Sequence, residues 1–122
     1  MSMSENMNVS FFLPSLRGGG AERMMVNLAK ELVYKGYNVE IVLAKKEGPY
    51  VDEVPNTIPI VDLAASRVLF ALPALTRYLK KRNPQVLLSA LHYANIVALL
   101  AKKIAGVSTR VVVSERNHLS ST

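Results

Sequence analysis

The sequence contains no cysteine, no tryptophan and only two histidines among its 122 residues. The lack of cysteine excludes disulfides, thiolate metal sites and thiol nucleophiles. No apolar run approaches the roughly 20 residues that a membrane-spanning helix needs, and residues 1–8 lack the apolar core of a signal peptide. We therefore expect a globular protein of the cytoplasm.

Acidic residues are few: nine Asp and Glu stand against 15 Lys and Arg, for a net charge of +6. This balance favours acidic partners. The basic runs 80–82 and 102–103 fall where helices are expected to end, and cations there complement the helix dipole. The alternative is a basic face in peripheral contact with an anionic membrane. Aromatic residues make up only 7% and do not alternate with these charges, which argues against nucleic acid.

Strand-like and helix-like segments alternate along the chain. Short apolar runs predict strands at residues 9–13, 39–44, 58–63, 86–90 and 110–114. Amphipathic periodicity predicts helices from residue 21 to Gly36, over 66–82 and over 95–105. Several strands are apolar throughout, which is typical of a parallel sheet covered on both faces. The sequence therefore predicts one α/β domain over 1–122, Rossmann-like and three-layered, with a mostly parallel sheet of about five strands.

The helix periodicity also predicts which residues face the core. In the second helix we expect Ser66 to cap the first turn and four leucines to point inward. In the third helix, we expect four Ile and Leu side chains to point inward. The inward residues expected for the two helices are Leu69, Leu72, Leu75 and Leu79, then Ile96, Leu99, Leu100 and Ile104.

A run of three glycines, Gly18 to Gly20, separates the first strand from the first helix. Glycine lets the backbone approach a ligand closely, and the first turn of a helix offers free N–H groups to an anion. Arg17 and Arg23 flank the run and favour an anion. The run is neither the dinucleotide fingerprint nor a P-loop, because Arg23 stands where the third glycine would be and no Gly-Lys-Ser/Thr follows. The alternative is a tight strand-to-helix connection without a ligand.

Polar residues also follow the later strands. His92 comes just after the fourth strand, and the cluster at 114–118 lies at the end of the fifth. Ligands of such sheets bind beyond the carboxyl ends of the strands, so we expect Gly18 to Gly20, His92 and Glu115 on one rim. Only four residues follow the cluster, so we expect the first half of a larger protein.

Three segments carry a family resemblance: FLPSLRGGGAER at 12–23, NLAKEL at 27–32 and KGYNV at 35–39. Together they resemble the opening of glycosyltransferase family four, the group 1 glycosyltransferases, although Tyr37-Asn38 stands where Gly-His-x is usual. The resemblance implies a GT-B enzyme, in which two Rossmann-like domains face a cleft. This chain would be the N-terminal, acceptor-side domain, and the C-terminal, donor-binding domain would be absent from it.

The resemblance implies an activity and assigns residues to it. Such enzymes move a sugar from a UDP- or GDP-sugar, with retention, to a glycan or lipid-linked acceptor, as in polysaccharide biosynthesis. They need no metal or cofactor, the nucleotide-sugar being a substrate. Because the glutamate pair of the second domain has no counterpart here, this chain alone is expected to be inactive. The implied residues are Arg17, Gly18, Gly19 and Gly20 for the donor phosphates, His92 and Glu115 as catalytic candidates, and His92, Glu115, Arg116 and Asn117 for the acceptor.

Glu115 departs from the histidine that many members carry at this point, which puts a copied catalytic role in doubt. Two other functions stay open. A free-standing nucleotide- or phosphate-binding module without catalysis fits the glycine turn, but an NAD site would need an acidic residue where Ala44-Lys45-Lys46 stands. A regulatory α/β domain would need an acidic residue at the end of the first strand, where residues 14–16 are Pro-Ser-Leu.

Overall fold

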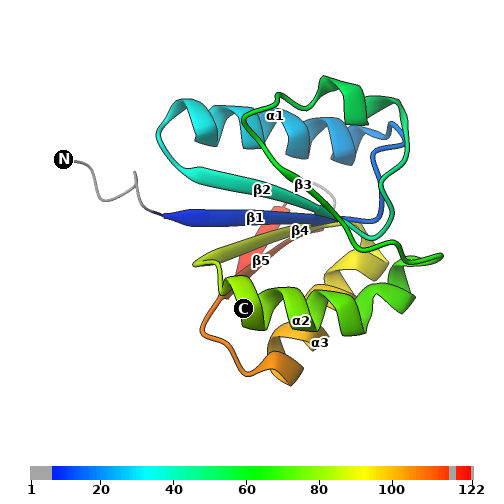
Figure 1. Cartoon of the computed structure of the whole chain (residues 1–122), viewed down its shortest axis with the longest axis vertical. Helices are drawn as coiled ribbons and strands as arrows, with labels where there is room; N and C mark the ends of the chain where they lie inside the picture. The colour runs from blue at the N-terminus through cyan, green and yellow to red at the C-terminus, as the bar shows by residue number, and fades with distance from the viewer. Residues whose placement is uncertain (1–6, 116–117, 122) are drawn as a thin grey trace.

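The computed structural model describes residues 7–115 and 118–121. Strands and helices alternate along most of this length, and two short 3₁₀ helices, η2 and η3, lie in the connections (Figure 1). In chain order the elements are β1 (Asn8–Leu13), α1 (Gly20–Tyr34), β2 (Asn38–Leu43), η2 (Pro49–Glu53), β3 (Ile60–Asp62), η3 (Val68–Ala71), α2 (Leu72–Arg82), β4 (Val86–Ala90), α3 (His92–Ala105), β5 (Arg110–Glu115) and β6 (His118–Ser121).

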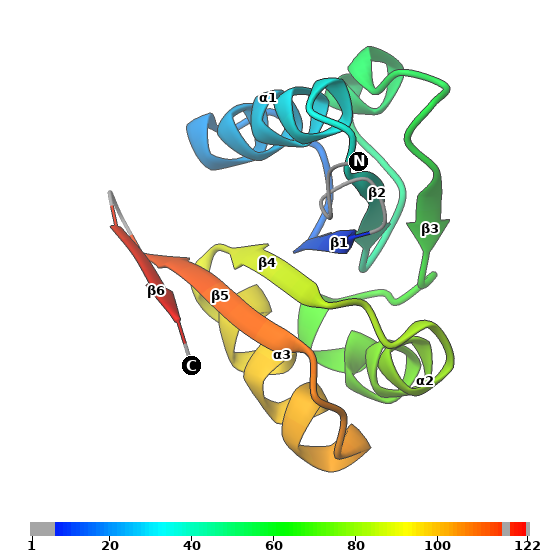
Figure 2. The same ribbon diagram turned by 90° about the vertical axis from the view of Figure 1, so that its left-hand side faces the viewer.

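The described strands form one sheet in the order β3-β2-β1-β4-β5-β6. The first five are parallel, as predicted, and β6 pairs antiparallel with β5. Helix α1 covers one face of the sheet, and α2 and α3 cover the other (Figures 1 and 2). The predicted α/β, Rossmann-like, three-layer arrangement is confirmed. The sequence analysis predicted no strand at the position of β6.

The chain reverses its direction of travel across the sheet between β1 and β4. It runs outward from β1 through β2 to β3, then returns to place β4 on the other side of β1. A crevice forms at such a switch point, beyond the carboxyl ends of the two adjacent strands. The topology therefore sets the glycine turn after β1 beside the start of α3 after β4.

The core lies in two layers because successive strand residues point to opposite faces of the sheet. In β1, Phe11 packs among the residues beneath α1, and Phe12 packs among those beneath α2 and α3; neither side chain is exposed. In β2, Ile41 and Val42 divide between the layers in the same way. Burial on both faces explains why these strands are continuous apolar runs.

Helix α1 matches its prediction closely. It ends in a Schellman motif, in which the Gly36 N–H donates to the Val33 carbonyl and the Tyr37 N–H donates to the Leu32 carbonyl. Gly36 has φ of 100°, so this position favours glycine.

Helix α2 begins later than predicted, at Leu72 rather than Ser66. Ser66 is exposed and does not cap it, and residues 68–71 form η3 instead. Pro73 occupies the first turn of α2, the place in a helix where a missing N–H costs least. Leu75 and Leu79 are buried as predicted, whereas Leu69 is 50% exposed.

Helix α3 begins earlier than predicted, at His92, and presents a different face to the core. Ala94, Val97, Ala98 and Ala101 are buried, and Leu99 is partly buried. The expectation that Ile96, Leu100 and Ile104 point inward is wrong, because these three are 36%, 44% and 58% exposed. Small residues allow α3 to approach α2 and the sheet closely, so the alanine-rich face packs and the larger side chains point outward. Within the described residues, no helix has the length and apolar character needed to cross a membrane.

Candidate functional site

The glycine turn connects β1 to α1 and lies at the switch point of the sheet. Gly19 is the N-cap of α1, with extended φ and ψ of −94° and 174°, and no side chain of the described residues caps the helix. The first backbone bond of the helix runs from the Arg23 N–H to the Gly19 carbonyl at 3.1 Å. The N–H groups ahead of Arg23 therefore have no acceptor within the helix, and they carry the positive end of its dipole.

The three glycines differ in what the fold demands of them. Gly18 has φ of 119°, which side-chain-bearing residues rarely adopt. Gly20 has ordinary helical geometry, and a Cβ built there meets no described atom within 4 Å. A Cβ on Gly19 would collide first with the Glu22 carboxylate, whose Oε1 would lie 2.5 Å away. The space in front of Gly20 is therefore open to a ligand, and Glu22 must swing aside if an anion is to occupy the helix N-terminus.

The segment at residues 47–50 holds the glycine turn from the side. The Leu16 N–H donates to the Glu47 carbonyl at 2.9 Å, and the Tyr50 N–H donates to the Leu16 carbonyl at 3.0 Å. Gly48 has φ of 111°, and a side chain there would collide with the backbone of Leu16. The sequence analysis missed these supporting residues, and Gly48-Pro49 in an otherwise irregular stretch is the signal that could have found them.

Both flanking arginines are engaged by this segment. The Arg17 Nε donates to Glu47 Oε2 at 2.6 Å, and this hydrogen bond, more than any other cause, holds the pKa of the Glu47 carboxyl below its usual value. The Arg23 guanidinium lies 4.7 Å from the centroid of the Tyr50 ring, and its Nε donates to the Tyr50 hydroxyl at 3.2 Å. Positive charge thus lies beside the turn, but an anion would compete with Glu47 for Arg17.

His92 is the first residue of α3 and is separated from the end of β4 by Leu91 alone. It is exposed, and its ring meets the Tyr93 ring edge to face, with centroids 5.2 Å apart. Leu91, between β4 and α3, has φ of 80° and ψ of 141°. Such a conformation costs a leucine about 1–3 kcal/mol, and backbone strain of this kind concentrates at functional sites.

The third predicted segment of the rim begins where β5 ends, at Glu115. Arg116 and Asn117 lie outside the described residues, and so does the side chain of Glu115. Asn95, which is 5% exposed, donates from Nδ2 to the Ser114 carbonyl at 3.0 Å and ties α3 to this end of β5. Because β1, β4 and β5 are adjacent and parallel, the glycine turn, His92 and the end of β5 share one edge of the sheet, as predicted.

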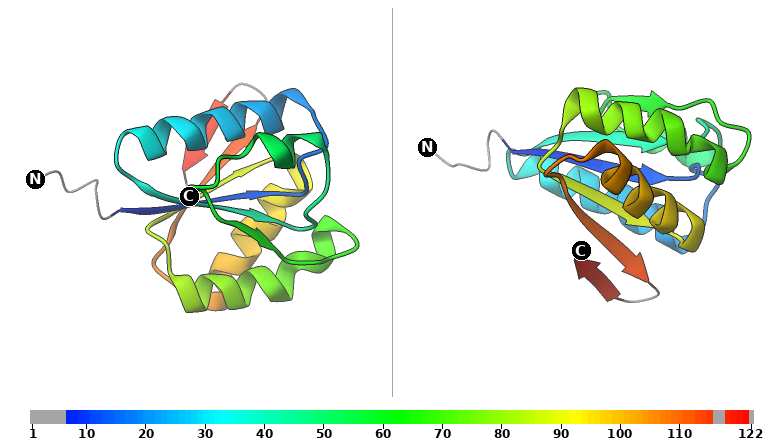
Figure 3. Two further views of the ribbon diagram at one scale, coloured as in Figure 1. Left: turned by 45° about the horizontal axis from the view of Figure 1, so that its top comes forward. Right: turned by 90° about the horizontal axis from the view of Figure 1, so that it is seen from below.

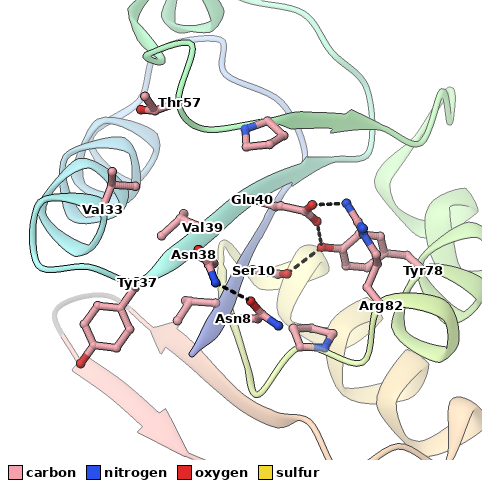
Figure 4. Close-up of a pocket in the computed structure, with 13 residues that line it drawn as sticks. Asn8, Ser10, Val33, Tyr37, Asn38, Val39, Glu40, Thr57, Tyr78 and Arg82 are labelled. Carbon is pink, nitrogen blue, oxygen red and sulfur yellow. Dashed lines mark hydrogen bonds and ion pairs between the residues drawn. The ribbon is translucent and has the colours of Figure 1, made fainter. Parts of the chain in front are cut away.

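A cavity of about 400 Å³ lies at the opposite edge, where the strands begin (Figure 4). Its polar wall is a chain of hydrogen bonds: Ser10 Oγ to the Tyr78 hydroxyl at 2.7 Å, and that hydroxyl to Glu40 Oε1 at 2.5 Å. Arg82 donates to the other oxygen of Glu40. The pKa of Tyr78 is raised above its usual value. Burial of the hydroxyl is the main cause, and its hydrogen bond to Glu40 is the second. These groups satisfy one another and join α2 to the sheet. Within the described residues, no group of three or more His, Cys, Asp or Glu side chains could hold a metal ion.

Comparisons with known proteins bear on the fold and the family. Among curated proteins, none matches this sequence significantly. Two of the similar solved structures are a lipopolysaccharide outer core galactosyltransferase, WaaB, in its apo form (17% identity, TM-score 0.67) and a glycosyltransferase from Rickettsia africae ESF-5 (18% identity, TM-score 0.68). A third is Phytolacca americana UGT2 complexed with UDP-2fluoro-glucose and pterostilbene (15% identity, TM-score 0.58).

The matches cover 88%, 88% and 95% of this chain but only 32%, 29% and 32% of those structures, so the chain spans about a third of their length. At these identities the likeness shows a shared fold, that of GT-B glycosyltransferases. The family itself rests on the sequence: the profile of Glycosyltransferase Family 4 matches residues 18–120, from the glycine turn to β6. The chain therefore belongs to glycosyltransferase family 4.

Proposed function

We propose that this chain is the acceptor-side domain of a retaining glycosyltransferase, which moves a sugar from a UDP- or GDP-sugar to a glycan or lipid-linked acceptor. The observation that carries the proposal is the uncapped N-terminus of α1 at the switch point of the sheet, with open space in front of Gly20. Membership of the family supports a transferase, and a structural neighbour that holds UDP-2fluoro-glucose supports a nucleotide-sugar donor.

The turn suits the leaving group of this reaction. During transfer, the bond between the anomeric carbon and the diphosphate oxygen breaks, a bond from an acceptor hydroxyl oxygen to the same carbon forms, and the hydroxyl proton is released. The departing nucleoside diphosphate gains negative charge. The N–H groups of Gly19 and Gly20, with the dipole of α1, would stabilise that charge, and Arg17 would add to it once Glu47 releases it.

The other segments of the rim would hold the acceptor. We assign His92 and Glu115 to the neighbourhood of the reacting hydroxyl, with Glu115 orienting it. Arg116 and Asn117 would bind the rest of the acceptor. Arg116 would donate bidentate hydrogen bonds from its guanidinium to a phosphate of a lipid-linked acceptor. The strained backbone at Leu91 supports a functional role for the start of α3.

The rest of the enzyme would supply what this chain lacks. Contacts to the nucleotide base would come from a C-terminal domain across the cleft, so the 122 residues alone should not transfer sugar. The reaction would need no metal or cofactor. It would take place in the cytoplasm, and the absence of cysteine fits that reducing compartment.

Amide NMR spectra of the chain during titration with UDP and GDP test the donor site. We expect shifts of the amides at residues 18–22, with a dissociation constant in the millimolar range or weaker, because the base has few contacts here. Gly20→Ala should keep the fold yet reduce the shifts, since its Cβ fills the open space. Asn27→Ala is the matched control, because Asn27 is exposed on the same helix.

Two results would contradict the proposal. Shifts confined to the amino edge, around Asn8 and Asn38, would move the site to the opposite cavity. Unchanged binding by Gly20→Ala would show that the turn does not meet the phosphates. Inorganic phosphate that binds as tightly as UDP would favour the alternative, a phosphate-binding module without catalysis.

A further inference from the structure

Two buried oxygens near the carboxyl edge of the sheet have no hydrogen-bond partner among the described residues. They are Ser89 Oγ on β4 and Asn95 Oδ1 on α3, and the two residues are 0% and 5% exposed. By contrast, the buried Ser10 hydroxyl at the amino edge bonds to the Tyr78 hydroxyl at 2.7 Å. At a buried position, an apolar side chain is more favourable than an oxygen that no protein group satisfies. Packing alone therefore does not explain a carboxamide at Asn95.

The nitrogen atoms of Asn95 bond to both sides of the rim. Its side-chain Nδ2 donates to the Ser114 carbonyl on β5 at 3.0 Å. Its backbone N–H donates to the Leu91 carbonyl, ahead of α3, at 2.9 Å. Leu91 precedes His92, and Ser114 precedes Glu115. One buried residue thus joins the two segments that carry the predicted acceptor groups.

The sheet stops holding these segments together at the same point. The parallel ladder between β4 and β5 ends with Ala90 opposite Ser114. The chain then leaves the sheet, and α3 runs back over its face against β4 and β5 (Figures 2 and 3). Leu91 lies at this turn with φ of 80°, a conformation that persists only where the surrounding contacts fix it. The bonds of Asn95 are contacts of this kind.

The other buried residues of α3 show that this layer can pack without a carboxamide. All of them are apolar, with small side chains that fit beneath the helix. An apolar contact tolerates small shifts of a helix along its neighbours, whereas a hydrogen bond weakens steeply when its length or angle changes. Asn95 therefore adds direction to a contact that is otherwise without it. These other buried residues are Ala94, Val97, Ala98 and Ala101.

We propose that Asn95 is a positioning residue, which holds the start of α3, with His92, against the end of β5, with Glu115. Its cost is a buried oxygen that no protein group satisfies. Displacements of about 1 Å can slow an enzyme about a hundredfold, so a fixed separation of two acceptor groups is worth such a cost. That these groups serve an acceptor rests on the proposed function, whereas the connection of the two segments does not. This chain itself buries Asn95, so the role does not depend on what covers its outer surface.

Amide hydrogen exchange of the chain, followed by NMR, tests the proposal with Asn95→Leu. Leucine has a similar shape but cannot donate to the Ser114 carbonyl. We expect the protection factors of residues 95–97 and 113–115 to fall at least about tenfold, because these segments lose their connection. Those of α1 and β2 should change less than about twofold. The urea midpoint should stay the same or rise, because the variant also removes an unsatisfied buried oxygen.

Ser89→Ala is the matched control. It removes the other unpartnered buried oxygen but leaves the bond from Asn95 to Ser114 in place, so protection at the two segments should not change. Asn95→Asp provides a rescue. A protonated carboxyl can donate to the Ser114 carbonyl, as the amide does, and an ionised one cannot. Protection at the two segments should therefore be low at high pH and recover as the pH falls, with the unaltered chain as reference.

Several outcomes would overturn the proposal. They are unchanged protection at the two segments in Asn95→Leu, an equal loss in Ser89→Ala, and no recovery of Asn95→Asp at low pH. If leucine overpacks the site and lowers protection throughout the sheet, the recovery of Asn95→Asp decides between a positioning role and general packing. Amide shifts of residues 18–22 with UDP are measured separately. Their absence from the unaltered chain would count against the proposed function and leave the role of Asn95 in the rim intact.

Discussion

The glycines of the turn differ in how far the fold constrains them. Gly18 is required by its own backbone, which has φ of 119°. Gly20 is not constrained by the described structure, because a Cβ there would meet no described atom within 4 Å. The proposed donor phosphates would use this open space. The arginines beside the turn were predicted as partners of an anion, yet Arg17 already pairs with Glu47. A phosphate would therefore bind by exchange with a carboxylate.

The Arg17–Glu47 pair predicts a measurable titration. Because the Arg17 hydrogen bond holds the pKa of Glu47 below its usual value, Arg17→Gln should raise that pKa toward the usual value. The pair favours the folded state above the usual carboxyl pKa, and this contribution is lost as the pH falls through the lowered one. Carbon-13 NMR of the Glu47 carboxyl provides the measurement.

Lys45→Gln is the matched control, because Lys45 acts on the same carboxyl but contributes less to its shift. Adding UDP to the unaltered chain should raise the pKa of Glu47 if phosphate draws Arg17 away. A Glu47 carboxyl that titrates at its usual pKa in the unaltered chain would refute the pair.

Among the elements, α3 shows most clearly where reasoning from periodicity fails. A helix with Ile and Leu on one side and Ala on the other has two faces with the same 3.6-residue period. Hydrophobicity favours the face with the larger side chains, but the face that packs in the core with α2 and the sheet carries mostly alanine (Figure 2). Close packing decided the orientation, and the larger side chains remained outside.

Two substitutions in α3 test this orientation. Ala98 is fully buried, so Ala98→Leu should overpack the core on this face of the sheet and lower the free energy of unfolding by about 1–3 kcal/mol. Leu100 is 44% exposed, so Leu100→Ala should cost less than about 1 kcal/mol. Urea unfolding measures both. A larger loss of stability in Leu100→Ala than in Ala98→Leu would support the orientation predicted from the sequence, in which Leu100 points inward.

At the scale of the whole molecule, two connections hold the layers in place. The segment at 47–50 fastens the β2–β3 connection to the glycine turn. At the other edge, Ser10, Tyr78, Glu40 and Arg82 join α2 to β1 and β2 (Figure 4). The amino edge of the sheet is thus closed by contacts within the protein, while the carboxyl edge keeps its uncapped helix N-terminus.

The second connection predicts an effect on stability. Tyr78→Phe removes the hydroxyl that Ser10 and Glu40 share, so the free energy of unfolding should fall by about 1–2 kcal/mol. Tyr34→Phe, at a side chain that is 87% exposed, should change it little. Because the folded-state pKa of Tyr78 is raised, its contribution is present below the ordinary pKa of 10.0 and is lost as the pH rises above it.

Thermal unfolding of both variants at neutral and alkaline pH checks this prediction. The unaltered chain should lose more stability on going to alkaline pH than Tyr78→Phe does. Equal losses in the two proteins would mean that Tyr78 does not keep its proton through these contacts.

The sequence by itself determined the five parallel strands and the rim, but not β6, because these features depend on local patterns and on one rule of topology. Apolar runs such as 9–13 predict buried strands, and the turn after each parallel strand must come to the same edge. The glycine turn and His92 could therefore be placed on one rim before the structure was known.

Only the tertiary structure decided which face of α3 packs, where α2 begins and what supports the glycine turn. Arg17 and Glu47 are 30 residues apart, and Arg23 and Tyr50 are 27 apart. No local pattern relates such positions, because their contact depends on how an irregular connection folds back over the sheet. The exposure of Ile96, Leu100 and Ile104 on α3 depends in the same way on how α2, α3 and the strands pack together, which no local pattern defines.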